Sequence, residues 1–176
     1  MADILGYSSE SSWAWEPVIG VLPEEGNLLE VGTYCGLSAS IWAKKLPKYM
    51  VHTVDVALGV PSTDSKGNPT WISREEQLNS IHQVVKNNEN LSFSEGDFFK
   101  IQIPEPFDNP DVFFYDANHN PGKTIEALNK LKQCPNIVVD DCQFDWVKEE
   151  VLLFVEENSR NLKLFKTEHF EVAVIQ

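Results

Sequence analysis

Short apolar runs alternate along this chain with segments whose apolar residues recur at helical spacing, and this alternation restricts the possible folds most. The short runs are rich in β-branched or aromatic residues and predict strands, which cover 27–31, 50–55, 91–95, 111–116 and 136–140. The helical spacing predicts helices, which cover 37–46, 74–87, 123–132 and 145–158. Two more predicted strands end the chain a short turn apart, at 162–167 and 170–175.

Strands that alternate with helices join into a parallel sheet through right-handed crossovers. The runs 111–116 and 136–140 are apolar almost throughout, which is typical of strands covered on both faces. We therefore expect five β/α repeats and a C-terminal antiparallel hairpin. The predicted fold is a Rossmann-like α/β fold with a seven-stranded, mostly parallel sheet and helices on both faces. Ligands bind such sheets at the carboxyl ends of the strands, where the strand order reverses.

The length and composition predict a single domain. A chain of 176 residues with 42% hydrophobic residues can bury one full core, and no repeat, low-complexity tract or linker divides it. We expect one domain over 1–176, with a short N-terminal segment, 1–26, and one long loop, 56–73. Loops of that length in compact domains are often binding lids.

The formal net charge of −13 makes nucleic acid and anionic membrane surfaces poor partners. No apolar run approaches the roughly 20 residues that cross a bilayer, and the first residues lack a basic segment followed by an apolar one. A cytoplasmic location is therefore expected. Three cysteines without CxxC spacing, Cys35, Cys134 and Cys142, indicate neither a disulfide framework nor a zinc site.

The first predicted strand ends in a turn that runs from Glu30 to Gly36, with the sequence EVGTYCG. Gly32 and Gly36 allow a ligand to approach the backbone, and the helix that follows offers free N–H groups. The Glu30 carboxylate would repel a pyrophosphate but suits a cationic ligand such as S-adenosylmethionine, which carries an ammonium and a sulfonium. The Gly-x-Gly-x-x-Gly pattern is absent, which disfavours a nicotinamide-dependent oxidoreductase. Tight packing alone would also explain the two glycines.

Two further acids follow predicted strands. Asp55 ends the second strand, where a carboxylate can accept both hydroxyls of an adenosine ribose. Asp97, after Gly96, ends the third strand, where a carboxylate can accept from an adenine amino group. A single strand-end Asp is more often a helix cap or a turn residue. Together with Glu30, these acids favour an adenosine site.

A second acidic cluster is expected where the next two strands end. Asp116 follows one strand and Asp140 and Asp141 follow the other, so all three should lie on one rim of the sheet. Carboxylates suit Mg²⁺ or Ca²⁺, and like charges held close together are costly without a cation. The alternative is that Asp140 and Asp141 cap the helix that follows.

The stretch LLEVGTYCGLSASIWAKKLP, followed by HTVD, resembles class I S-adenosylmethionine-dependent methyltransferases, and among them the metal-dependent catechol and caffeoyl-CoA O-methyltransferase type. The similarity covers roughly 27–55 and 95–146 and is most specific in the pattern Glu-x-Gly-x-Tyr-x-Gly-x-Ser. The resemblance implies that Glu30, Gly32 and Ser38 surround the amino-acid end of the cofactor, with Asp55 at its ribose and Asp97 at its adenine. The cofactor-binding set that we expect is Glu30, Gly32, Thr33, Tyr34, Gly36, Ser38, Asp55, Gly96, Asp97 and Asp116.

The resemblance also implies a divalent metal, most simply Mg²⁺, bound by Asp116, Asp140 and Asp141. Such a metal would hold and acidify a substrate hydroxyl. The family places a Lys base three residues after the first metal-binding Asp, and this chain has His119 there instead. A histidine can accept a proton at neutral pH, so His119 is the candidate catalytic base. The alternative is that His119 only caps the loop before Pro121.

Two functions are compatible with these residues. The first is a Mg²⁺-assisted O-methyltransferase (EC 2.1.1.-) that acts on a catechol, phenolic or sugar-like hydroxyl of a small molecule. The second is a non-catalytic S-adenosylmethionine-fold binding module that uses the acidic rim as a metal or protein contact. Four tryptophans are candidates to cover the cofactor or stack on an aromatic acceptor, or else are ordinary core or interface residues: Trp13, Trp15, Trp71 and Trp146. The sequence neither requires nor excludes a homodimer that forms through the N-terminal segment or the terminal hairpin.

Overall fold

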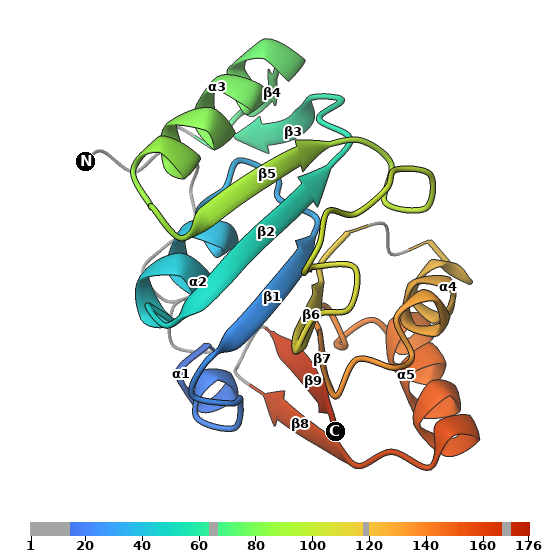
Figure 1. The fold of residues 1–176 in the computed structure, drawn as a ribbon. Helices are drawn as coiled ribbons and strands as arrows, with labels where there is room; N and C mark the ends of the chain where they lie inside the picture. The colour runs from blue at the N-terminus through green and yellow to red at the C-terminus, as the bar shows by residue number, and fades with distance from the viewer. Residues whose placement is uncertain (1–14, 64–66, 118–119, 167–169) are drawn as a thin grey trace.

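The computed structural model describes residues 15–63, 67–117, 120–166 and 170–176. Its main sheet has seven strands in the order β5-β2-β1-β6-β7-β9-β8 (Figure 1). These strands are β1 (Gly26–Val31), β2 (Tyr49–Asp55), β5 (Leu91–Glu95), β6 (Val112–Tyr115), β7 (Asn136–Val139), β8 (Leu162–Lys166) and β9 (Glu171–Ile175). The first five pair in parallel, and β9 is antiparallel to both β7 and β8. The expected fold class is confirmed.

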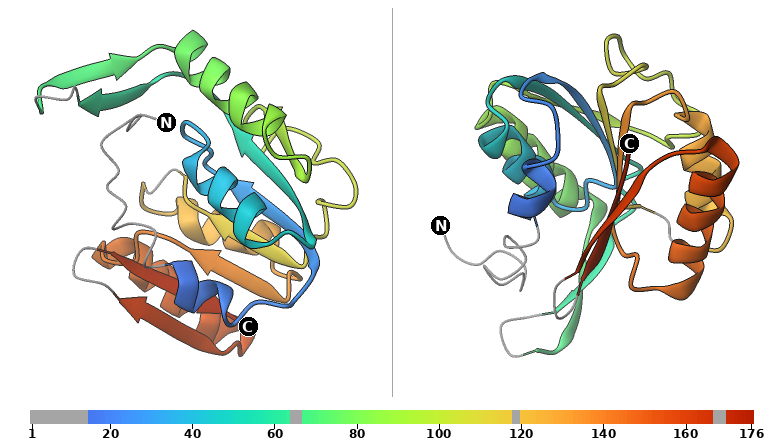
Figure 2. Two further views of the ribbon diagram at one scale, coloured as in Figure 1. Left: turned by 90° about the vertical axis from the view of Figure 1, so that its left-hand side faces the viewer. Right: turned by 90° about the horizontal axis from the view of Figure 1, so that it is seen from below.

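Helices cover both faces of this sheet (Figure 2). One layer is formed by α1 (Trp15–Ile19), α2 (Leu37–Lys45) and α3 (Arg74–Lys86), and the other by α4 (Lys123–Lys130) and α5 (Asp145–Asn158). Side chains alternate along β1: Leu28 packs with the first layer and Leu29 with the second. Every residue of β6, β7 and β9 is buried, which the continuous apolar runs 111–116 and 136–140 predict for β6 and β7.

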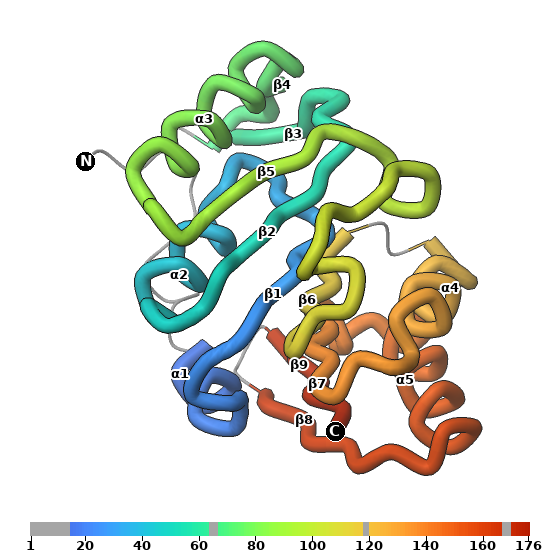
Figure 3. The backbone as a smooth tube through the Cα atoms, viewed as in Figure 1, coloured from blue at the N-terminus to red at the C-terminus, as the bar shows by residue number. Residues whose placement is uncertain are grey.

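Strand order reverses between β1 and β6. Figure 3 follows the backbone from β1 outward to β2 and β5, and then back across the sheet to β6 and β7. The carboxyl ends of β1 and β6 are neighbours, because Val31 pairs with Tyr115 at the last position of both strands. This end of the sheet is therefore the place where the topology predicts a ligand.

The structure corrects the expected number of repeats, because no helix joins β5 to β6. The connection 96–111 is described throughout and consists of turns and bends. Pro104, Pro106 and Pro110 explain this difference, since proline lacks the N–H that a helix needs and disfavours helical backbone in the residue before it. Four β/α repeats are therefore present in the described chain, not five.

The expected long loop, 56–73, is also corrected in part. Within it β3 (Val60–Thr63) pairs in antiparallel fashion with β4 (Pro69–Ile72), and the two form a separate ribbon that extends from the body of the protein (Figure 2). The β-branched residues Val60, Thr63, Thr70 and Ile72 account for strand formation here. Among the described residues, no helix is long and apolar enough to cross a membrane.

Candidate cofactor and acceptor site

The turn after β1 packs directly against the end of β6. Gly32 has φ 103°, and a Cβ atom there would lie 1.7 Å from the backbone oxygen of Asp116. Only glycine fits such a contact, so the tight-packing explanation holds for this glycine. Tyr34 follows with φ 51°, and Gly36, with φ 91°, precedes the first residue of α2. The conformation of the turn is therefore explained by its packing and backbone geometry alone.

Glu30 is fully buried beneath this turn. Its Oε2 accepts a hydrogen bond from Thr53 Oγ1, which also bonds to Thr33 Oγ1, whereas Oε1 has no hydrogen-bond partner among the described residues. Burial raises the pKa of Glu30 to about 8, although the nearby hydroxyl groups of Thr53 and Ser38 lower it. The carboxyl is therefore largely protonated at neutral pH, and a neighbouring cation would favour its ionised form.

A cavity of about 550 Å³ opens at the carboxyl ends of β1, β2 and β5. Its lining brings together many of the predicted cofactor residues: Gly32, Tyr34, Asp55, Gly96, Asp97 and Asp116. The rest of the wall is mostly apolar and includes Val56, Leu58, Phe98 and Phe99. An apolar cavity with a few acceptors at its edge has the composition of a site for a nucleoside.

Asp55 and Asp97 also organise the backbone around this cavity. Asp55 accepts hydrogen bonds from the backbone N–H groups of Tyr34, at 2.9 Å, and Ala57, at 2.7 Å. Asp97 accepts from the backbone N–H of Phe99 at 2.9 Å and pairs with Lys100 at 2.7 Å. The hydrogen bond with Lys100 is the largest cause that lowers the pKa of the Asp97 carboxyl, and the hydrogen bond from Phe99 is the second. Both acids therefore have the turn-ordering role that was the alternative for a single Asp. A carboxylate oxygen that accepts one hydrogen bond can still accept another.

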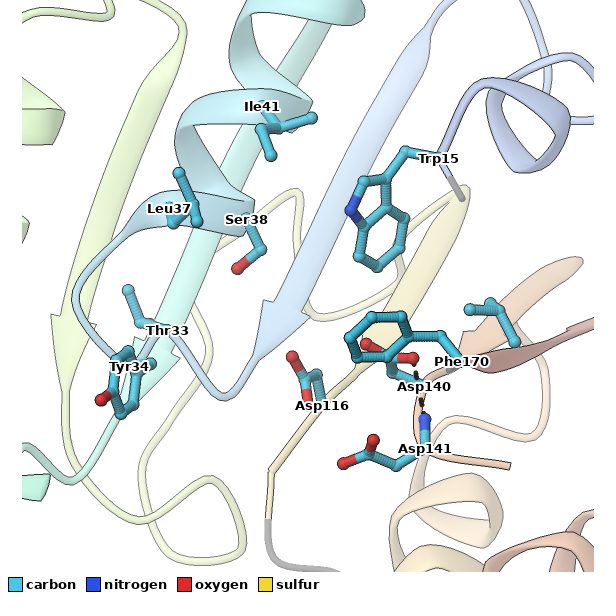
Figure 4. A pocket seen from close by; sticks show the side chains of 11 residues that line it. Trp15, Thr33, Tyr34, Leu37, Ser38, Ile41, Asp116, Asp140, Asp141 and Phe170 are labelled. Atoms are coloured by element: carbon cyan, nitrogen blue, oxygen red, sulfur yellow. Dashed lines mark hydrogen bonds between the residues drawn. The ribbon is translucent and has the colours of Figure 1, made fainter. Parts of the chain in front are cut away.

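A second cavity, of about 120 Å³, is also lined by Asp116 (Figure 4). Its polar lining comes from Thr33, Tyr34, Ser38, Asp116, Asp140 and Asp141, and its apolar lining from Trp15, Leu37, Ile41, Phe170 and Val172. Two residues, Tyr34 and Asp116, line both cavities. The two spaces therefore adjoin where β1 and β6 end.

The acidic rim has a geometry of its own. Asp140 Oδ1 accepts from the backbone N–H of Asp141 at 2.8 Å, and Asp141, with φ 59°, accepts from Gln143 Nε2 at 2.5 Å. The N-cap of α5 is Phe144, which makes no side-chain cap hydrogen bond, so neither Asp is the N-cap of that helix. No group of three or more His, Cys, Asp or Glu side chains in the described chain is arranged to hold a metal ion. The three carboxylates share a cavity but do not fit a preformed metal site.

His119 lies outside the described residues, as does Trp13. Trp15 packs edge to face on Trp42, with ring centroids 4.9 Å apart, and on Phe114, so it is a core residue that also lines the second cavity. Trp146 stacks on Phe144 with ring centroids 5.1 Å apart. Trp71 is 63% exposed and lines neither cavity. The three cysteines are buried and free.

The sequence did not predict that side chains of α3 bond to the turn after β1. Gln77 donates to the backbone oxygen of Tyr34 at 2.8 Å, and Ser80 Oγ donates to the backbone oxygen of Cys35 at 2.9 Å. The two side chains are three residues apart and so share one face of the helix. That spacing within a polar helix was the only available signal, and it does not identify backbone partners.

No protein-family model and no curated protein matches this sequence. Solved structures do match. A precorrin-6y C5,15-methyltransferase from Geobacter metallireducens has a TM-score of 0.64 and 14% identity, over 100% of this chain and 92% of that chain. The O-methyltransferase NovP has a TM-score of 0.63 and 16% identity, over 93% and 75%. An rRNA methylase from Streptococcus thermophilus has a TM-score of 0.61 and 12% identity, over 97% of both chains. The chain therefore shares the fold of these proteins.

Proposed function

We propose that this chain is an S-adenosylmethionine-dependent methyltransferase that acts on a hydroxyl group of a small molecule. The observation that carries the proposal is the pair of adjoining cavities, which share Tyr34 and Asp116. A methyl donor and its acceptor must meet end to end, and adjoining cavities provide that arrangement. In this assignment the larger cavity takes the adenosine half of the cofactor. The smaller cavity takes the reacting part of the acceptor.

Asp116 supplies negative charge for the cationic end of the cofactor, and Glu30, which lines neither cavity, would add to that charge on ionising. Asp116 lines both cavities, and its charge is one of the causes that raise the pKa of Glu30. A bound ammonium or sulfonium would relieve the repulsion between these acids and favour the ionised form of Glu30. The Glu30 oxygen that has no hydrogen bond among the described residues is consistent with this assignment.

The cofactor supplies an electrophilic methyl group. Transfer forms a bond between the acceptor oxygen and the methyl carbon and breaks the bond between that carbon and sulfur, while the hydroxyl proton leaves to a base. Trp15, Ile41 and Phe170 give the smaller cavity an apolar wall, which limits the access of water to the reacting atoms. The carboxylates of Asp116 and Asp141 line the same cavity and can orient a hydroxyl group by accepting its hydrogen bond.

A small acceptor is supported by charge and by size. The net charge of −13 opposes a phosphate backbone, although an rRNA methylase is among the similar structures. The smaller cavity, at about 120 Å³, accommodates only the part of an acceptor that carries the hydroxyl. Mg²⁺ assistance and proton transfer to His119 remain predictions of the family resemblance. The carboxylates in the described part of the chain do not form a preformed site for such a metal.

The proposal is tested by incubating the protein with S-adenosylmethionine and a panel of catechols, flavonoids and sugars, with and without Mg²⁺. Formation of a methyl ether together with S-adenosylhomocysteine is the expected result. Loss of activity in Asp141→Ala together with dependence on Mg²⁺ would support the metal prediction, and equal activity without Mg²⁺ would remove it. Cofactor binding without methyl transfer to any acceptor would favour the non-catalytic binding module.

A further inference from the structure

Gln77 is a fully buried polar residue in the first turn of α3. Its Nε2 donates to the backbone oxygen of Tyr34 at 2.8 Å, and its Oε1 accepts from the backbone N–H of Gly59 at 2.9 Å. A buried amide costs free energy unless its donor and acceptor groups are bonded. One of its partners belongs to the turn after β1 and the other to the base of the β3–β4 ribbon. Gln77 therefore links two segments that border the larger cavity.

Both backbone partners have left-handed conformations. Tyr34 has φ 51° and Gly59 has φ 83°. A tyrosine in this region is uncommon and persists where its surroundings hold it. At position 59 a Cβ atom would lie 2.8 Å from the backbone oxygen of Ile72 and equally close to the indole nitrogen of Trp71. Gln77 thus forms hydrogen bonds with the backbone at two positions that have left-handed conformations.

Other bonds join the same three segments. Tyr34 Oη donates to the backbone oxygen of Pro61 in β3 at 2.9 Å, and Ser80 bonds to the turn at Cys35. The start of α3 is itself fixed by a capping box between Ser73 and Glu76. The base of the ribbon is therefore anchored to α3 and to the turn.

We propose that Gln77 is a positioning residue for cofactor binding, which holds the turn after β1 and the base of the ribbon at the separation that keeps the larger cavity open. The inference rests on the proposed function, because the adenosine site is part of it. Gln77 does not line the cavity and acts through two residues: Tyr34, which does, and Gly59, which precedes the lining residue Val60. A cavity that is already in shape binds its ligand more tightly, since little has to be ordered on binding.

The test substitutes Gln77→Met, which keeps the length of the side chain and removes both hydrogen bonds. Gln83→Met is the matched control, because Gln83 is an exposed glutamine on the same helix. Calorimetric titration with S-adenosylmethionine should show affinity reduced by about tenfold in Gln77→Met, as expected for the loss of two ordinary hydrogen bonds. Gln83→Met should bind like the wild type.

Amide hydrogen exchange measured by NMR distinguishes positioning from general destabilisation. In Gln77→Met the Gly59 amide should exchange faster while amides of the central strand β6 keep their protection. If Gln77→Met does not fold, Tyr34→Phe, which removes the hydroxyl that donates to Pro61 and also bonds Ser62, should still weaken binding by a few-fold, on the scale of one or two hydrogen bonds.

Wild-type affinity in folded Gln77→Met, or in Tyr34→Phe where that variant is the one used, would overturn the inference while leaving the proposed function intact. An unchanged exchange rate at Gly59 in Gln77→Met would overturn it equally. Failure of the wild-type protein to bind S-adenosylmethionine would instead overturn the proposed function, and this inference with it.

Discussion

The backbone of Gly32 lies against the backbone oxygen of Asp116, so closely that a Cβ atom at position 32 would be 1.7 Å from that oxygen. The contact joins the ends of β1 and β6 at the point where strand order reverses. Asp116 also lines both cavities.

Gly32→Ala should therefore destabilise the protein by roughly 3 kcal/mol or more, as steric overlap is added to an unfavourable φ. Gly67→Ala is the control, because Gly67 also has positive φ, at 80°, but its added Cβ would meet nothing within 4 Å. The unfavourable φ alone should lower the free energy of unfolding of Gly67→Ala by roughly 1 kcal/mol. Urea denaturation measures both values. Equal losses in the two variants would show that the contact with Asp116 is relieved at little cost.

Glu30 should make stability fall as pH rises toward 8. Its pKa is raised to about 8 in the folded protein, above the ordinary value of 4.5, so the folded state binds the extra proton between those values. The stabilising contribution is complete below pH 4.5 and is lost as pH rises through 8. The slope from one proton is at most about 1.4 kcal/mol per pH unit.

Between pH 6.5 and 8, Glu30→Gln should flatten this slope in a series of denaturation curves. The effect of His52 is small in that window. A variant with the same slope as the wild type would exclude Glu30 as its source.

His52 should have the opposite effect at lower pH. It is buried between Ser92 and Ser94, each of which bonds one ring nitrogen, and it stacks on Phe107. Burial lowers its pKa to about 4, so the neutral form stabilises the fold above pH 6.5 and this contribution is lost as pH falls toward 4. His52→Gln should reduce the loss of stability between pH 6.5 and 4.5, measured by thermal unfolding. An unchanged acid sensitivity would assign the loss to other groups.

The positions of the strand-end acids could be predicted from the sequence, whereas their surroundings could not. Glu30 and Asp55 follow apolar runs, and the carboxyl ends of parallel strands must meet at one edge, so their convergence is a consequence of the fold class. Tyr34, which lines both cavities, has a left-handed backbone conformation that no periodicity encodes.

Other features were missed because their causes are not local. Gln77 bonds backbone atoms that lie 43 and 18 residues away in the sequence, and a glutamine in a polar helix gives no sign of such partners. The antiparallel pairing within 56–73 was hidden by the polar and Gly- and Pro-containing composition of that segment. Asp141 combines a positive φ with a bond to Gln143, and this local geometry was not evident in the adjacent acids that suggested a metal site.

The central claim is tested most directly by calorimetric titration of S-adenosylmethionine into the wild type, Asp55→Asn and Asp111→Asn. Asp111 is a matched control, because it also accepts a backbone N–H, that of Asn27 at 2.8 Å, but lies at the opposite end of the sheet from both cavities. We predict saturable binding to the wild type and to Asp111→Asn, and binding weakened by about tenfold or more in Asp55→Asn, where the ribose loses a charged acceptor. Absence of binding to the wild type, or equal loss in both variants, would contradict the assignment of this cavity to the cofactor.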